Sequence, residues 1–246
     1  MEDLDALVRR VDEDRWMASR FAPADVRRRL IAIYAVNYEI ARTAEVVKEP
    51  TLGDIRLAWW RDAIADALAG NPSDQHEALA ALRVAHGEAQ LSAQHFAMLI
   101  EARRHDLDAA PFADWSAFDA YVDATAGSVM RLAVEACAGA VGDEDSAFIT
   151  RAAWLWGAVG LLRAEPTWRA RGRPLLPSSA DALVARVEAE LSALRALHAP
   201  PPDLFPAYGY VANAAAYLRG LRRNGAAPSP FARRLRIVAA AATGRV

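Results

Sequence analysis

The sequence predicts an all-α protein organised as a single domain, residues 1–246. Apolar residues recur at helical spacing through most of the chain, and the alternation typical of strands is hard to find. The connections between the periodic segments are short and rich in Pro, Gly, Asp or Ser. A chain of 246 residues, 54% of them hydrophobic, can bury one large core. We therefore expect roughly eight to ten helices around a central apolar cavity.

The first long helix is predicted between Pro23, which a first helical turn tolerates, and Pro50. One face of this helix carries Val26, Leu30, Ile33, Asn37 and Ile40. The next helix is predicted to begin at Thr51, whose hydroxyl can cap it with Asp54 three residues later. Its predicted apolar face is formed by Leu52, Ile55, Trp59, Ala63 and Ile64, and its predicted end by Gly70, Asn71 and Pro72.

Six further helices are predicted by the same periodicity. Their expected ranges are 88–107, 115–138, 143–163, 180–197, 204–222 and 230–242. The proline cluster HAPPPDLFPAY at 198–208 could act as a linker between domains. The helical tail after it is too small to form a core alone, so we expect it to dock on the main body.

Charge and cysteine content exclude several classes of protein. The formal net charge of −2 gives no global field for nucleic acid or an anionic bilayer, although a local patch stays open. The single cysteine, Cys137, forms no disulfide framework and indicates a reducing compartment. The N-terminal segment lacks a secretory signal, and the longest apolar run, Ala152 to Leu162, is too short to cross a bilayer. We expect a cytoplasmic protein, with peripheral contact at the inner face of the membrane left open.

Common catalytic motifs are missing from the sequence. The five histidines lack the i, i+4 pairing of a helical zinc site, so surface or capping roles are favoured. There is no glycine-rich phosphate loop, and the segment TAGSV lacks the glycine pattern of a nucleophile elbow. These observations argue against acyl-transfer hydrolases.

Four segments together carry a family resemblance. They are DRWMASRFAP (14–23), AIYAVNYEIA (32–41), GDIRLAWWRDAI (53–64) and YVDATAGSVMRL (121–132). In this order the segments resemble the squalene/phytoene synthase family, and the resemblance covers roughly Asp14 to Pro177. It implies an isoprenoid-synthase-type helical bundle around a central cavity. Active members of the family join two prenyl diphosphates head to head with magnesium.

Magnesium is the physical test of that activity, because Mg²⁺ bridges carboxylates on two facing helices to the diphosphate. Where active members carry the first aspartate motif, this sequence has ARTAE, with Ala41, Arg42 and Glu45 at the matching positions. At the second motif, GLLRAEPTWRARGRPLLP, Ala164 and Trp168 replace the two aspartates. Pro166 is expected to end the helix there. We expect no catalytic residue, metal or other cofactor, with magnesium retained only if the chain is an active synthase.

Three segments also match a subgroup of the family that resembles a respiratory complex I assembly factor. They are VNYEIA, KEPTLGDIRLAWW and LLRAEPTWRARGRPLLP. The resemblance implies a non-catalytic factor that binds an isoprenoid or lipid ligand, or a complex I subunit or assembly intermediate; nucleic acid is not expected as a partner. The alternative is an active prenyltransferase that condenses prenyl diphosphates head to head. The sequence leaves open whether the chain is an enzyme and favours binding.

Candidate ligand-binding residues follow from the resemblance and from residue chemistry: Tyr34, Asn37, Tyr121, Gly127, Ser128, Arg163 and Arg173. Arg163, Arg169, Arg171 and Arg173 form either an anion site or a solvated loop. Trp59, Trp60, Trp154 and Trp156 fill the core or line a lipid tunnel, with the core favoured. Asn37 and Glu39 indicate either a polar network at a cavity or an exposed edge.

Overall fold

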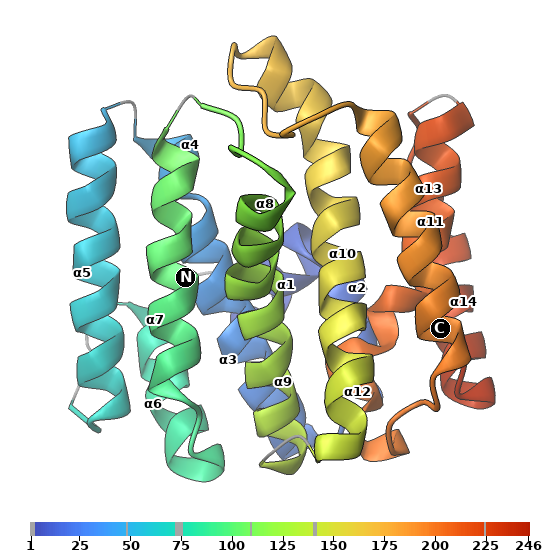
Figure 1. The fold of residues 1–246 in the computed structure, drawn as a ribbon. Helices are drawn as coiled ribbons and strands as arrows, with labels where there is room; N and C mark the ends of the chain where they lie inside the picture. The colour runs from blue at the N-terminus through green and yellow to red at the C-terminus, as the bar shows by residue number, and fades with distance from the viewer. Residues whose placement is uncertain (1–2, 48, 72–75, 109, 140–141, 224) are drawn as a thin grey trace.

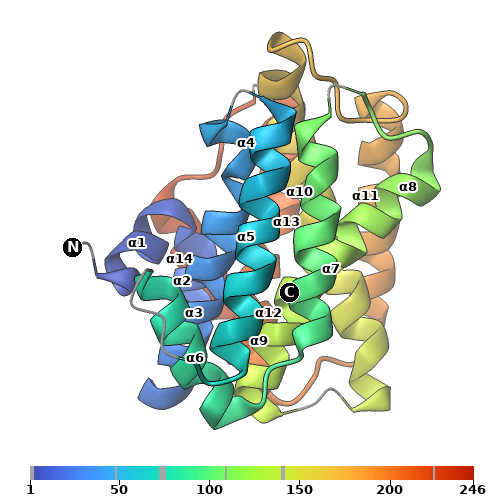
Figure 2. The same cartoon turned by 90° about the vertical axis from the view of Figure 1, so that its left-hand side faces the viewer.

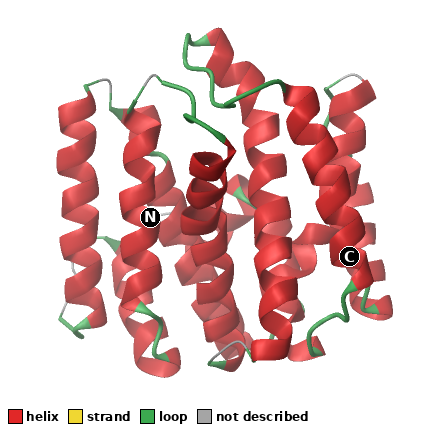
Figure 3. Cartoon of the chain, in the orientation of Figure 1, coloured by secondary structure: helices red, strands yellow, loops and turns green. Residues whose placement is uncertain are grey.

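The computed structural model describes residues 3–47, 49–71, 76–108, 110–139, 142–223 and 225–246. Within these ranges every regular element is helical (Figure 3). The elements up to residue 107 are α1 (Leu4–Val11), α2 (Glu13–Ser19), α3 (Ala24–Ala41), α4 (Thr43–Val46), α5 (Pro50–Leu68), α6 (Glu77–Ala89), α7 (Ala93–Ala102) and the 3-10 turn η1 (Arg103–Leu107).

The remaining elements include the longest helix, α10. They are α8 (Trp115–Val122), the π-helical turn η2 (Asp123–Gly127), α9 (Ser128–Ala138), α10 (Asp143–Ala170), α11 (Ala180–Ala196), η3 (Pro202–Leu204), α12 (Phe205–Tyr208), η4 (Gly209–Asn213), α13 (Ala214–Arg223) and α14 (Pro230–Thr243). The expected ranges 115–138, 180–197 and 230–242 agree with these bounds to within a residue or two at the outer ends.

The helices form an upright bundle (Figure 1). Helix α5 lies at one lateral edge, and α11, α13 and α14 lie at the opposite edge. Seen from the side, α5 and α7 run next to each other (Figure 2), and the two helices are in contact. One hydrophobic cluster runs through the bundle and includes residues from Val8 near the N-terminus to Ala240 in α14. The tail beyond the proline cluster therefore packs on the main body, as expected.

Helix α3 is buried along most of its length because apolar side chains occur on nearly all of its faces. Leu30, Ile33, Tyr34 and Ile40 are among its buried residues. The helix ends at Ala41, where the sequence pattern predicted continuation to Pro50. The short helix α4 follows at Thr43, so the segment that resembles the first aspartate motif lies at a break between two helices.

The prediction for α5 was wrong in two respects. The helix begins at Pro50, so Thr51 lies inside the first turn and is not the cap. Leu52, Ile55 and Trp59, expected on the buried face, are 54%, 60% and 39% exposed. Ile64 of the predicted face is buried as expected, and the core also contains Leu57 and Trp60, which were not predicted. Of the predicted end signals, Gly70 has a left-handed backbone (φ 83°), while Pro72 lies outside the described residues.

Other boundaries also differ from the prediction. The expected helix 88–107 includes only the last two residues of α6; Gln90, with a left-handed backbone at φ 52°, ends that helix, and the rest of the range forms α7 and η1. The range 204–222 consists of η3, α12, η4 and α13 in place of one helix.

Helix α10 continues through Pro166 to Ala170, so the expected stop at this proline was wrong. A proline inside a helix loses one hydrogen bond. Two other contacts hold the end of α10. Arg169 pairs with Glu165 across one turn, and the Arg173 N–H donates to the Trp168 carbonyl at 3.0 Å.

Candidate functional site

A cavity of about 190 Å³ lies in the middle of the bundle, between α2, α3, η1, the α8–η2–α9 segment and α10. Its wall contains both polar and apolar groups: Arg15, Asn37, Arg103, Tyr121, Val122, Thr125, Ala126, Val129, Trp156, Gly157, Gly160 and Leu161. The expectation of a central cavity is confirmed, and its wall is partly apolar as expected but also carries polar and charged groups. Two guanidinium groups, one from α2 and one from η1, border it.

Arg15 reaches the cavity from α2 and is buried. Its Nη1 donates to Asp12 Oδ2 at 2.7 Å, and its guanidinium lies 5.6 Å from the Tyr34 ring and 5.1 Å from the Tyr210 ring. Its Nε is buried without an acceptor among the described residues. One carboxylate and two aromatic faces therefore offset the cost of burying the charge of Arg15 inside the bundle.

Arg103 reaches the cavity from η1. Its Nη1 donates to Asp106 Oδ2 at 3.1 Å and to the Tyr121 hydroxyl at 2.9 Å, and that hydroxyl donates to Asp106 Oδ1 at 2.6 Å. Burial raises the pKa of Tyr121 above its ordinary value, so the hydroxyl stays protonated and can donate. The three groups form a closed network that fixes Arg103 at the cavity wall.

The structure brings only some of the predicted ligand-binding residues to this cavity. Asn37 and Tyr121 line it, and the Asn37 Oδ1 has no donor among the described residues. Tyr34 lies behind Arg15, and Ser128 is buried with an unpartnered hydroxyl, but neither lines the cavity. Gly127 lies beside Asp123, whose Oδ1 would be 2.9 Å from a Cβ at this position. The binding roles of these residues stay predictions.

Arg163 lies in a second, more polar cavity of about 250 Å³, separated from the first by Trp156. Its guanidinium lies 4.0 Å from the centre of the Tyr217 ring. The same cavity contains Asp14, a buried carboxylate that accepts from Tyr217 Oη at 2.5 Å, Asn213 Nδ2 at 3.0 Å and Arg233 Nη1 at 3.0 Å. Asp14 thus occupies donors of Tyr217, Asn213 and Arg233, whereas Arg163 forms no ion pair with any described residue.

The arginine-rich turn after α10 is held by structural contacts. Arg173 donates from Nη2 to the carbonyls of Asp106 (2.6 Å) and Asp108 (2.7 Å), which ties this turn to the loop before α8. The guanidinium groups of Arg171 and Arg173 lie 5.7 Å and 5.2 Å from the Trp168 ring. Of the two alternatives for these arginines, a shared anion site is not favoured, because Arg163 lines the cavity while Arg173 donates to the carbonyls of the loop.

The residues at the two motif positions do not fit a magnesium ion. Ala41 and Ala164 have no ligand atoms, and Arg42 donates to Glu39 at 3.3 Å. Glu45 is exposed and forms no ion pair with any residue that the structure describes. Glu165 is buried, but one of its carboxylate oxygens accepts from Arg169 and the other from the Leu175 N–H at 2.8 Å. In the ranges that the structure describes, no three His, Cys, Asp or Glu side chains converge as metal ligands.

The structure also shows where Glu39, His76 and the tryptophans lie. Glu39 is buried away from the cavity, between Arg42, Arg56 (3.7 Å) and His76 (4.0 Å). His76 also caps α6 by accepting the Ala78 N–H at 3.2 Å, which confirms the expected capping role for this histidine. Among the tryptophans, Trp60 is in the core, Trp59 is exposed, and Trp156 forms the wall between the two cavities.

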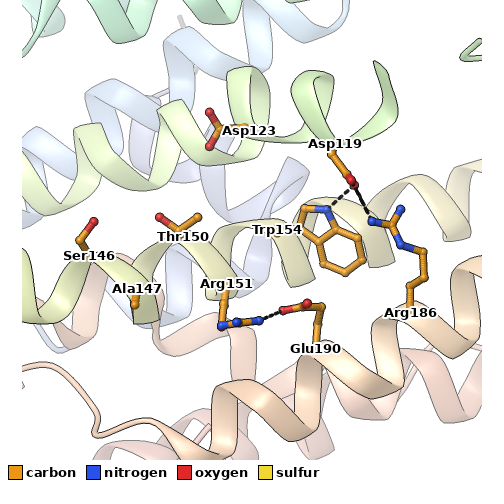
Figure 4. Close-up of a pocket in the computed structure, with 9 residues that line it drawn as sticks. All are labelled: Asp119, Asp123, Ser146, Ala147, Thr150, Arg151, Trp154, Arg186 and Glu190. Carbon is orange, nitrogen blue, oxygen red and sulfur yellow. Dashed lines mark hydrogen bonds and ion pairs between the residues drawn. The ribbon is translucent and has the colours of Figure 1, made fainter. Parts of the chain in front are cut away.

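Trp154 belongs to a larger surface groove between α8, α10 and α11 (Figure 4). Asp119 accepts from Trp154 Nε1 and from Arg186 Nη2, both at 2.8 Å. Arg151 pairs with Glu190 along the same groove. These contacts link α8, α10 and α11, although Arg186 Nη1 is buried without an acceptor among the described residues.

The inward position of Arg15 and the pairing of Asp14 were not predicted from the sequence. The sequence offers only a weak signal for Arg15, which is that the small residues Ala18 and Ser19 follow it by three and four positions on the same helix face. No local signal identifies Asp14, since its partners Asn213, Tyr217 and Arg233 lie about two hundred residues away along the chain.

A helical bundle in which α3 and α10 face each other across a central cavity has the architecture of the isoprenoid synthases. The chain belongs to the squalene/phytoene synthase family, whose sequence profile matches residues 8–189. Among solved structures, it is similar to squalene synthase HpnC from Alicyclobacillus acidocaldarius, with 20% identity, a TM-score of 0.75, and coverage of 92% of this chain and 94% of that one. A dehydrosqualene synthase determined in complex with ligand gives a TM-score of 0.73 at 13% identity, over 98% and 94% of the two chains.

Curated relatives carry a different name from these synthases. The mouse (Mus musculus) protein named NADH dehydrogenase (ubiquinone) complex I, assembly factor 6, is 28% identical over 173 residues, which is 70% of this chain and 51% of the relative. The human (Homo sapiens) protein of the same name is 25% identical over the same shares. The chain therefore spans about half the length of the curated relatives it matches.

Proposed function

We propose that the protein works by binding and not by turnover, as a factor in the assembly of respiratory complex I. Its partner in this proposal is a complex I subunit or an assembly intermediate. The proposed role in complex I assembly is supported by the relatives named as complex I assembly factor 6. The protein would act from the cytoplasm, with peripheral contact at the inner face of the membrane; none of the described helices is long and apolar enough to cross a bilayer.

The central cavity is the observation that carries the proposal. Its volume of about 190 Å³ lies below the roughly 300–1,000 Å³ typical of small-molecule sites. Two prenyl chains would need far more space, and they would contact Arg15 and Arg103. The Nε atoms of both arginines have no acceptor among the described residues, and a prenyl chain offers none. Packing an apolar chain against these groups is therefore unfavourable.

The motif positions support the same proposal, because the carboxylate of Glu165 already accepts from Arg169 and from the Leu175 N–H and is not free to bind a metal ion.

A lipid-like ligand would find more room outside the central cavity. An apolar groove of about 780 Å³ runs between α7 and α8, and its lining includes Ala97, Met98, Phe112 and Ala117. We place an isoprenoid or lipid chain in this groove as part of the proposal.

Deletion of the gene tests the role in the cell. We expect assembled complex I to fall while squalene- and carotenoid-type products stay unchanged, and a plasmid copy of the wild-type chain to restore the complex. Intact complex I together with a missing isoprenoid would contradict the proposal.

The alternative function is prenyl transfer, which the likeness to solved squalene and dehydrosqualene synthases favours at the level of the fold. Purified protein incubated with prenyl diphosphates, with and without Mg²⁺, tests it directly. We expect no condensed product in either condition. Magnesium-dependent formation of a head-to-head product would establish the alternative.

A further inference from the structure

The charge of this protein is distributed very unevenly along the chain. Up to and including Asp203, the sequence carries 22 basic and 31 acidic residues, a net charge of −9. The 43 residues after Asp203 carry seven arginines and no acidic residue. The net charge of −2 for the whole sequence therefore combines an acidic region with a strongly basic segment. Such asymmetry is typical of proteins that contact an anionic polymer or membrane.

Part of this positive charge is neutralised inside the fold. Arg233 and Arg234 pair with Glu13, and Arg222 pairs with Glu188. The other four, Arg219, Arg223, Arg236 and Arg245, form no ion pair with any residue that the structure describes. Positive charge thus remains at the edge of the bundle formed by α13 and α14 (Figure 1).

Helix α14 also exposes an apolar stripe at that edge. Phe231, Leu235 and Val238 are 76%, 58% and 48% exposed, and their spacing of four and three residues places them on one face of the helix. The opposite face is anchored in the core through Ile237 and Ala240. Arg234, three residues after Phe231 and four before Val238, flanks the exposed stripe.

A basic groove opens at the C-terminal end of the same helix. It has a volume of about 810 Å³, and Arg195, His198 and Arg245 line it with Asp145 as the single acidic residue among its lining. Arg195 has no ion-pair partner among the described residues. Guanidinium groups in such a groove can bind the phosphates of lipid headgroups.

We propose that α14 and the groove at its C-terminal end form a docking surface for an anionic lipid bilayer. Phe231, Leu235 and Val238 insert into the interfacial region, while Arg195 and Arg245 contact phosphates. This inference rests on the peripheral membrane contact proposed above, and it assigns that contact to one face of the molecule. Charge complementarity selects the bilayer as the occupant.

The stripe on α5 gives a matched control within the same chain. Leu52, Ile55 and Trp59 are exposed to a similar degree at the opposite edge of the bundle. Acidic side chains at Asp54, Asp62 and Asp66 accompany the arginines of α5. An anionic surface should therefore select α14 over α5, although both stripes are apolar.

Vesicle sedimentation tests the proposal with the whole chain. We expect binding to phosphatidylcholine vesicles containing roughly 30% phosphatidylglycerol, weakening with salt, and little binding to phosphatidylcholine alone. The double variant Phe231→Ser/Leu235→Ser should lower the partition coefficient at least tenfold. Arg195→Gln/Arg245→Gln should lower it about fivefold for each arginine removed. Leu52→Ser/Ile55→Ser in α5 should bind like the wild type.

Thermal unfolding of each variant checks that the fold is kept, since all substituted side chains are exposed. Equal losses in the α5 and α14 variants, or no loss in the α14 variant, would overturn the assignment of the surface. Loss of a dimer in gel filtration with unchanged vesicle binding would instead make α14 an interface between copies of the chain. Failure of the wild type to bind anionic vesicles would refute the membrane contact itself, whereas the complex I proposal depends on the deletion phenotype.

Discussion

Two glycines on one face of α10 offer a matched pair of substitutions at the central cavity. A Cβ added to Gly157 would lie 2.7 Å from Val122 Cγ1 and 2.8 Å from Ala126 Cβ. A Cβ added to Gly160, almost one turn later, would meet no atom of its surroundings within 4 Å. Both glycines line the cavity, so the two positions differ mainly in how closely α8 and η2 approach α10.

The magnitudes follow from these distances. Overpacking of a tight core costs typically 1–3 kcal/mol, and two simultaneous overlaps at Gly157 place this cost near ~3 kcal/mol. Alanine regains about 1 kcal/mol through its higher helix propensity. We therefore expect Gly157→Ala to lower the free energy of unfolding by about 2 kcal/mol. The same change at Gly160 should raise it by up to about 1 kcal/mol.

Equilibrium urea unfolding followed by far-UV circular dichroism measures both variants against the wild type. The expected order of stability is Gly160→Ala, then wild type, then Gly157→Ala. Equal stability of the two alanine variants would refute the close packing of α10 against η2, and with it the narrow central cavity.

Three further predictions concern buried polar groups. Asp14→Ala should lower the free energy of unfolding by about 3 kcal/mol, because Tyr217 and Arg233 lose a buried acceptor; a loss below about 1 kcal/mol in urea unfolding would contradict this. Glu165→Ala should accelerate hydrogen exchange at the Leu175 amide, and unchanged exchange would show that the turn is held by other contacts. Burial raises the pKa of Cys137 to about 12, so at pH 8 only about one thiol in ten thousand is ionised. Ellman's reagent should therefore react with native protein far more slowly than with urea-unfolded protein, with the native rate rising as the pH approaches 12; equal rates at pH 8 would contradict the burial.

Local sequence signals predicted the helices well where one side of the helix is clearly apolar or an end is marked. The starts of α11 and α14 follow Ser179 and Ser229, whose hydroxyls accept N–H groups of the first turn. Helix α6 was missed, because its buried face consists largely of alanine and leucine in an alanine-rich stretch and gives weak contrast. The exposed side of α5 was misassigned, since periodicity cannot tell an outer apolar stripe from a buried one.

The site was only partly predictable for a related reason. Asn37 and Tyr121 were named as candidate ligand-binding residues from the sequence, and both line the cavity, although the sequence left open whether Asn37 faces a cavity or an exposed edge. The sequence left the role of the arginine-rich turn open, because Arg173 finds its acceptors in the carbonyls of Asp106 and Asp108, more than sixty residues earlier in the chain. Contacts between residues so far apart in the chain form only in the completed fold. They cannot be predicted from the pattern of neighbouring residues.

The pairing of Asp14 with Arg233 has a consequence for how the chain is made. These residues are 219 positions apart, and translation at about 5–20 residues per second separates their synthesis by roughly 10–40 s. Until α14 emerges, Asp14 lacks its arginine, and burying an unpaired carboxylate is strongly unfavourable. Helix α2 can therefore dock only provisionally while the middle of the bundle condenses. The ion pair between Asp14 and Arg233 therefore forms only after residues 8–189, which match the family profile, have been synthesised.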